Sequence, residues 1–306
     1  MTKPKLLSDD QVRSFIVDGF ISLEADIEPR LNEEIYALLK YSSENETPLG
    51  NNILSRIPRM HEVLRCPKVK GALISLLGPD YFIHPHRAMH KTTPVSEGTR
   101  PVHKTKPITE DTEKFGLLTD AHLMGEGSTA TSVWHQDSQS PLARARHHVP
   151  RYLIGFYFPH AVSKDMGPTR IQVGSYMHSR VSELRNIYQP ETVDAGTFFL
   201  LHFDMVHAGF PNFGDTDRYM MKFVFTRTYD PRKPTWDNKD SNWYKPSSTL
   251  NDDDLSSAWR FIWNWLLGAR SPDGGALAAV RLGKMQGESE ENNRIRAIYA
   301  DSDVDE

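Results

Sequence analysis

Two segments of the sequence carry side chains that could bind a metal ion. His135 and Asp137 stand two residues apart in SVWHQDSQS, and His207 lies in LLHFDMVHAG. Residues i and i+2 of a β-strand project from the same face, so a strand here would direct an imidazole and a carboxylate into one cavity. Two histidines and one carboxylate are the ligand set of non-haem Fe(II) sites that keep positions open for O2 and a co-substrate. A His-X-Asp pair alone is weak support, because most such pairs lie hydrogen-bonded on a surface.

An arginine follows the second histidine. Arg218 opens the run RYMMKFVFT, which is typical of a strand. A guanidinium binds both oxygens of a carboxylate, whereas a lysine ammonium supplies only a point charge. Arg218 is therefore a candidate for binding a carboxylate group of a ligand. Taken alone, such a residue is more often an ordinary surface arginine at the start of a strand.

In combination these residues resemble a known family. The order of His135-Gln136-Asp137, then GPTRIQVGSYMH, then His207 and Arg218 is similar to the phytanoyl-CoA dioxygenase family of Fe(II)/2-oxoglutarate-dependent oxygenases, to which ectoine hydroxylase is related. The resemblance extends over about residues 8 to 230 and is strongest from 134 to 228. It implies a double-stranded β-helix, or jelly roll.

The resemblance also implies a role for each candidate residue. Fe(II) would be held by His135, Asp137 and His207 as the catalytic centre, and 2-oxoglutarate would be contacted by Arg218, Phe156 and Lys91. Core packing is an equally good interpretation of Phe156, and Lys91 matches the family only loosely. Gly209 stands where many relatives have Ser, so one hydrogen bond to the co-substrate would be missing or supplied elsewhere.

The implied reaction converts 2-oxoglutarate and O2 to succinate and CO2 while hydroxylating a small molecule that the sequence does not identify. Two other classes stay open: a cupin-like metalloenzyme using another divalent metal such as Zn, Mn or Ni, and a non-catalytic binding protein on the same scaffold. Two basic stretches, residues 84–106 and 144–151, are solvated loops on one interpretation. On the other they rim the site and attract an anionic substrate.

The elements that would position these residues follow from the apolar periodicity. Residues 1–79 are predicted to be mostly helical, with a capping box at Ser8, a stop at Gly19, a strand from Phe20 and a helix between Pro67 and Gly78. Residues 80–230 contain short aromatic and β-branched runs between turn residues, which predicts an antiparallel sandwich or barrel. The clearest strands are RYLIGFYF, GTFFLLHF and YMMKFVFT, whose near-continuous apolar content requires both faces to be covered.

The predicted fold class is therefore mainly β with flanking helices: a cupin-like jelly-roll core with the N-terminal helices packed on one sheet. Residues 231–306 are predicted to add a helical extension with an acidic tail, so that 1–306 form a single domain. NDDDLSSAWRFIWNWLLG predicts a capped helix with Trp259 and Trp263 on its apolar stripe. We expect this helix to pack on the domain, with a dimer contact or a cover over the active site as the alternative.

Composition restricts the function classes. The chain has 306 residues and a formal net charge of -4, which gives no reason to expect nucleic acid or a membrane as a partner. No apolar run approaches the ~20 residues needed to span a bilayer, and the polar start MTKPKLLSDDQ does not resemble a signal peptide. The single Cys66 excludes an internal disulfide and a cysteine-based zinc site. These features predict a cytoplasmic protein, monomer or homodimer, acting on a small molecule that could be anionic.

Overall fold

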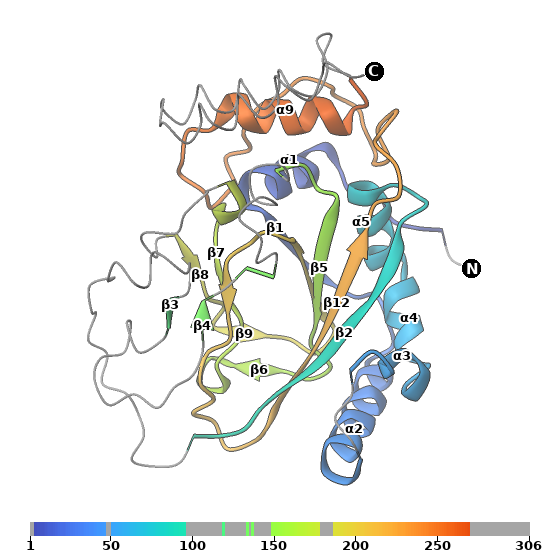
Figure 1. The fold of residues 1–306 in the computed structure, drawn as a ribbon, viewed down its shortest axis with the longest axis vertical. Helices are drawn as coiled ribbons and strands as arrows, with labels where there is room; N and C mark the ends of the chain where they lie inside the picture. The colour runs from blue at the N-terminus through green and yellow to red at the C-terminus, as the bar shows by residue number, and fades with distance from the viewer. Residues whose placement is uncertain are drawn as a thin grey trace, which may run out of the picture.

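A computed structural model describes residues 3–46, 50–95, 118–119, 133–134, 136–137, 148–177 and 186–269 of the chain. Figure 1 shows helices α2 to α5 along one side of a set of β-strands, with α1 and α9 at one end of them. The predicted acidic tail lies outside the described residues, and so do residues 96–106 and 144–147 of the two basic stretches.

The helices are α1 (Asp9–Asp18), α2 (Pro29–Asn45), α3 (Ile53–Arg56), α4 (Met60–Arg65), α5 (Pro67–Leu77) and α9 (Ser256–Leu266). The strands are β1 (Phe20–Glu24), β2 (Phe82–Thr92), β3 (Leu118–Thr119), β4 (Val133–Trp134), β5 (Tyr152–Tyr157), β6 (Val162–Ser163), β7 (Arg170–Gln172), β8 (Ile187–Tyr188), β9 (Thr192–Val193), β10 (Thr197–His202), β11 (His207–Ala208) and β12 (Arg218–Thr226).

The N-terminal helices begin and end where the sequence predicts. Ser8 and Gln11 form both bonds of a capping box at the start of α1, and Gly19 ends this helix in the left-handed region at φ 81°. Pro67 occupies the first turn of α5, where its missing N–H costs nothing, and Gly78 ends that helix. The capping box, both stops and the strand that follows α1 are therefore confirmed.

A five-stranded antiparallel sheet in the order β1-β10-β5-β12-β2 forms the centre of the protein. The three clearest predicted strands are its β10, β5 and β12, and all nine residues of β12 are buried. Such strands are apolar throughout because each face packs against another layer. The expectation that both faces are covered is confirmed.

Helices cover one face of this sheet (Figure 1). Tyr157 of β5 donates a hydrogen bond of 2.5 Å to Asn32 of α2, and the ring of Tyr219 on β12 packs edge-on against Tyr36 of α2 at 5.7 Å between centroids. A tyrosine buried in this way keeps a partner for its hydroxyl group while its ring fills the core. This face of the sheet is therefore structural.

A second, three-stranded antiparallel sheet in the order β11-β7-β8 covers the opposite face. The ring of Phe156 on β5 lies 5.2 Å from the ring of His207 on β11, and Phe199 on β10 lies 6.3 Å from Tyr188 on β8. These two contacts join the sheets face to face. We call the surface of the five-stranded sheet that carries Phe156 and Phe199 the inner face.

Residues 84–92 of the first basic stretch differ from one of its two interpretations, the solvated loop. They belong to β2, which pairs with β12 from Thr92 opposite Arg218 to Phe82 opposite Thr226, with one register shift near Phe223. β2 is an edge strand, where Pro85 is tolerated because its missing N–H need not donate to a neighbour. The loop interpretation is therefore wrong for these residues, because pairing with a buried strand outweighs their polar character.

The C-terminal helix α9 packs on α1, as predicted. Trp259 and Trp263 are fully buried, and Trp263 lies 5.1 Å from the ring of Trp236. The prediction that this helix is capped is wrong: α9 starts at Ser256, and Leu255 in the capping position makes no side-chain hydrogen bond. The tertiary contacts of the two tryptophans hold this helix without a cap.

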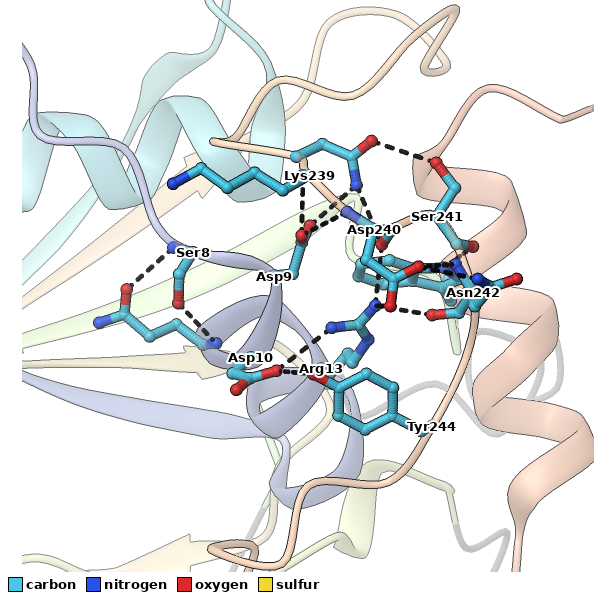
Figure 2. Close-up of polar contacts among 12 residues, drawn as sticks. Ser8, Asp9, Asp10, Arg13, Lys239, Asp240, Ser241, Asn242 and Tyr244 are labelled. Carbon is cyan, nitrogen blue, oxygen red and sulfur yellow. Dashed lines mark hydrogen bonds and ion pairs between the residues drawn. The ribbon is translucent and has the colours of Figure 1, made fainter.

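Asp9 and Arg13 of α1 make polar contacts with residues 236–244, the segment before α9. Figure 2 shows contacts of both residues. The Asp9 carboxylate accepts hydrogen bonds from the indole of Trp236 (2.6 Å), the Asn238 side chain (2.8 Å) and the backbone N–H groups of Lys239 and Asp240 (both 2.8 Å). Hydrogen bonds to the ionised carboxylate outweigh its burial, so the pKa of Asp9 lies below its ordinary value of 3.8.

Arg13 is the second member of this network and is completely buried. Its guanidinium donates to the carbonyl oxygens of Asp240 (2.8 Å) and Asn242 (2.6 Å). It also lies over the rings of Tyr244 and Trp263, 3.9 and 4.4 Å from their centroids. The network, defined by Asp9, Arg13 and residues 236–244, is called the α1 clasp below.

Candidate functional site

The inner face of the five-stranded sheet collects the charged residues of the candidate site. Arg218 and Lys222 are four apart on β12 and therefore project from the same face. Lys222 pairs with Phe156 of β5, whose ring contacts His207 across the gap between the sheets. Side chains directly opposite each other in an antiparallel pair share a face. Arg218, Lys222, Phe156 and His207 thus border one interior region.

Arg218 is a buried cation that lacks a carboxylate partner among the described residues. It is 5% exposed, and its guanidinium donates to the Thr92 hydroxyl at 2.7 Å and, over longer distances of 3.4 and 3.5 Å, to the carbonyl oxygens of Met166 and Phe210. Burial, and then the positive charge of Arg170, lower the pKa of Arg218 to about 10. A buried cation normally has an anionic partner, so this position favours an anion from outside the described part of the chain.

Arg170 brings a second guanidinium to the same region. It starts β7, is 4% exposed, and donates to the carbonyl oxygen of Gly209 at 3.2 Å. Its guanidinium lies 4.4 Å from the centroid of the Phe210 ring. A Cβ atom on Gly209 would lie 3.4 Å from the nearer Arg218 nitrogen, so Gly209 borders the Arg218 side chain. Two buried guanidiniums near each other raise the local positive potential.

His207 starts β11 and is buried, with 4% exposure. Its Nδ1 lies 3.0 Å from the carbonyl oxygen of Met205. A carbonyl only accepts, so Nδ1 is the donor, and Nε2 is the ring nitrogen that could bind a metal. Fixing one ring nitrogen on a backbone carbonyl is the usual way in which a metal-binding histidine is oriented.

Asp137 lies near Lys222 but not on a strand. The described strand β4 ends at Trp134, and Asp137 follows in a bend, which corrects the expectation that the His135–Asp137 pair sits on a strand. Its Oδ1 accepts a hydrogen bond of 2.5 Å from the Lys222 ammonium. Gln136 fixes this segment by donating to the carbonyl oxygen of Asp204 at 2.6 Å, which replaces the strand pairing that we expected.

The donor set fits a divalent metal in its chemistry. His135 lies outside the described residues, and among the residues that are described no group of three His, Cys, Asp or Glu side chains could hold a metal. The other two predicted ligands lie next to one cross-strand pair: His207 contacts Phe156, and Asp137 pairs with Lys222, which stands opposite Phe156 in the sheet. A metal-bound carboxylate can use one oxygen for the metal and the other for a supporting hydrogen bond, so the Lys222 contact is compatible with a ligand role for Asp137.

The two remaining predicted residues have different surroundings. Phe156 is 1% exposed and lies against His207, which suits both core packing and a wall of the site. The Lys91 ammonium pairs with Asp217 at 2.9 Å and lies near the ring of Tyr219. Lys91 alternates with Thr92 on β2, so it projects from the face opposite to Arg218. The described structure does not bring Lys91 to the inner face.

A cavity of about 180 Å³ adjoins Asp137 on the inner face. The described residues that line it are His84, Asp137, Tyr152, Phe203, Lys222 and Val224. Along β12 it lies on the Lys222–Val224 side, away from Arg218. A cavity with apolar walls and a few polar groups at one end has the character of a small-molecule site.

Sequence reasoning missed Lys222, and it considered Arg170 of GPTRIQVGSYMH only as an alternative to Arg218 for the co-substrate carboxylate. A signal for Lys222 was present, because a lysine within a strand predicted to be covered on both faces must be buried and paired. Its partner Asp137 is 85 residues away in the sequence, and no local pattern connects the two.

Comparison with known proteins gives relatives only at the level of structure. No family model matches the sequence, and no curated protein sequence matches it. EctD from S. alaskensis, solved with 2-oxoglutarate and 5-hydroxyectoine, superposes with a TM-score of 0.51 at 17% identity over 81% of this chain and 86% of its own.

Two further solved structures are similar. The non-heme monooxygenase ThoJ in its apo form gives a TM-score of 0.48 at 17% identity over 82% of this chain and 94% of its own. The non-heme alpha ketoglutarate dependent carbocyclase SnoK from nogalamycin biosynthesis gives 0.48 at 14% identity over 74% and 87%. The chain shares its fold with EctD, and the resemblance predicted from the sequence is confirmed at that level.

Proposed function

We propose that the protein is an Fe(II)- and 2-oxoglutarate-dependent oxygenase that hydroxylates a small molecule and releases succinate and CO2. The observation that carries this proposal is the buried Arg218. It has no carboxylate partner among the described residues, and it lies on the same face as Lys222 and Phe156, which contact Asp137 and His207. A dianionic co-substrate bound between the metal ligands and Arg218 would supply the missing negative charge.

The two facing antiparallel sheets would be the halves of a double-stranded β-helix. The fold shared with EctD supports this interpretation, and so does the position of His207 on one sheet opposite Phe156 on the other. A closed pair of sheets keeps water away from the region between them, where charge interactions are stronger than in solvent.

In this proposal His135, Asp137 and His207 hold Fe(II), which supplies the chemistry of O2 activation when it is bound. The carbonyl oxygen of Met205 holds Nδ1 of His207, so that Nε2 offers its lone pair to the metal. Lys222 holds the Asp137 carboxylate at one oxygen. Arg218 binds the distal carboxylate of 2-oxoglutarate, and Phe156 forms an apolar wall next to His207.

The first test is metal and co-substrate binding under anaerobic conditions. Asp137→Ala and His207→Ala should each abolish Fe(II) binding and turnover of 2-oxoglutarate to succinate, while thermal unfolding stays cooperative because neither residue belongs to the apolar core. His61→Ala on α4 is the matched control, because it removes a histidine from the helical layer. Unchanged iron affinity in both ligand variants would reject the metal site.

Succinate release then separates the proposal from its two alternatives. An oxygenase forms succinate only with Fe(II) and O2. A cupin-like enzyme that uses another metal would leave 2-oxoglutarate unchanged. A binding protein would bind ligands without any turnover. Mass-spectrometric detection of a gain of one oxygen in candidate compounds would identify the substrate.

A further inference from the structure

The Lys222 ammonium has more hydrogen-bond donors than the described residues use. Lys222 is 7% exposed, and among the described residues its ammonium makes a single hydrogen bond, to Asp137. An ammonium has three N–H donors, and a buried cation is stable only when its charge is balanced. Lys222 also lines the 180 Å³ cavity, so a ligand in that cavity can reach it.

Metal binding would change the balance of charge around the Lys222 ammonium. When Asp137 binds a divalent cation, its negative charge is shared between that cation and the Lys222 ammonium. The ammonium then lacks part of its counter-charge at a position that water reaches poorly. An anionic group in the cavity would restore it. This step rests on the proposed function, since it takes Asp137 as a metal ligand.

The rest of the cavity indicates the remainder of the ligand. Tyr152, Phe203 and Val224 provide aromatic and aliphatic walls, and the rings of Tyr152 and Phe203 lie 5.7 Å apart. Arg218 lies four residues along β12, about 13 Å from Lys222 at the usual rise of a strand, so its carboxylate site and this cavity are separate. One ammonium matches one carboxylate, whereas a phosphate dianion would need further donors.

We propose that Lys222 is a specificity residue that binds the carboxylate of the primary substrate, and that this substrate is a small monocarboxylate with an apolar or aromatic body. The carboxylate lies against the ammonium, and the body lies between Tyr152, Phe203 and Val224. The substrate is thereby oriented beside Asp137, where the proposed metal would act.

The test compares matched charged and neutral probes in the intact protein, loaded anaerobically with Fe(II) and saturated with 2-oxoglutarate so that Arg218 and the metal are occupied. Calorimetric titrations use benzoate against benzamide, and hexanoate against hexanamide. The parent should bind each carboxylate about tenfold or more tightly than its amide, the size expected for a charged hydrogen bond.

Three substitutions test whether Lys222 causes the preference for the carboxylate probes. The preference for the carboxylate should fall below about threefold in Lys222→Met and Lys222→Gln and persist in Lys222→Arg. Lys222→Gln can still donate to Asp137, so it serves if the Met variant fails to fold. Lys164→Met, which removes an exposed lysine paired with Glu191, should behave as the parent.

Titration of 2-oxoglutarate into the same variants separates the two proposals. We expect the Lys164→Met control to bind 2-oxoglutarate with a dissociation constant within about threefold of that of the parent. Two results would overturn the inference about Lys222 and leave the proposed function standing. One is equal binding of carboxylate and amide probes by the parent, and the other is a carboxylate preference that persists in both Lys222→Met and Lys222→Gln. Failure of the parent to bind 2-oxoglutarate would overturn the proposed function, and a carboxylate preference that still depended on Lys222 would then support the cavity assignment by itself.

Discussion

Two buried arginines of this protein have opposite surroundings. Arg13 in the α1 clasp donates to two backbone carbonyl oxygens, lies within 3.4 Å of carboxylate oxygens of Asp10 and Asp240, and is covered by two aromatic rings. Arg218 on the inner face has one short bond, to a hydroxyl group, and another guanidinium nearby. The first cation is matched within the chain, whereas the described residues leave the second without an anion. Arg13 is therefore a structural charge, whereas the surroundings of Arg218 suit the binding of an anionic ligand.

The largest effect that we expect concerns stability. Arg13→Met should lower the free energy of unfolding by about 3 kcal/mol or more, because the carbonyl oxygens of Asp240 and Asn242 lose their donor in a buried place. The same change at Arg218 should cost less than about 1 kcal/mol, because it also removes a buried and poorly compensated charge. Chemical denaturation of both variants measures the difference. Equal losses would mean that Arg218 is as structural as Arg13.

The next effect concerns the co-substrate. Arg218→Lys keeps the charge but loses the planar fork, so 2-oxoglutarate affinity should fall by about 1.5–3 kcal/mol, roughly tenfold to a hundredfold. Arg218→Ala should be worse, because the distal carboxylate would then be buried without a counter-charge. Fe(II) affinity should stay close to that of the parent in both variants.

Anaerobic titration of 2-oxoglutarate into the iron-loaded variants gives the answer. Arg13→Met is a control here, because the α1 clasp lies outside the candidate site and its loss should leave the affinity of the folded protein unchanged. If Arg218→Ala bound the co-substrate as tightly as the parent, another cation would have to hold it, and Arg170 is the next residue to test.

The smallest effect is a pH dependence of the α1 clasp. The pKa of Asp9 lies below 3.8, so the folded state binds fewer protons here than the unfolded state. The stability contributed by Asp9 is therefore fully present above the ordinary pKa and is lost as the pH falls through the lowered one. Asp9→Asn should be less stable than the parent near neutral pH, and the gap in urea midpoint should narrow below about pH 4. A constant gap down to pH 2 would show that the charge of Asp9 is unimportant.

Much of the fold follows from the sequence, because its signals are local. Ser8 and Gln11 define the start of α1, and the runs that become β5, β10 and β12 are apolar because these strands lie between two layers. β2 gave no such signal, because an edge strand can carry charges and a proline as long as one neighbour accepts its hydrogen bonds. Strand partners of this kind are decided by tertiary contacts, which the sequence pattern does not contain.

The candidate site could be predicted less completely. Residue types and order indicated Asp137, His207 and Arg218, and the structure places His207 and Arg218 on facing sheets. The Lys222–Asp137 pair depends on the approach of two segments that are distant in sequence, and only the folded chain shows it. His135 lies outside the described residues, and its role stays a prediction. Lys91 shows the limit of a loose family match, because strand alternation directs it away from Arg218.

The α1 clasp has a consequence for the order of folding. Arg13 and Asp9 find their partners 227 to 231 residues later in the chain, at 236–242. During synthesis α1 can form early, but its buried charges remain in water until the last part of the domain has emerged. Contacts between such distant residues form slowly, since the loop between them must close first. We therefore expect α1 to pack into its final environment late, once residues 236–244 are present.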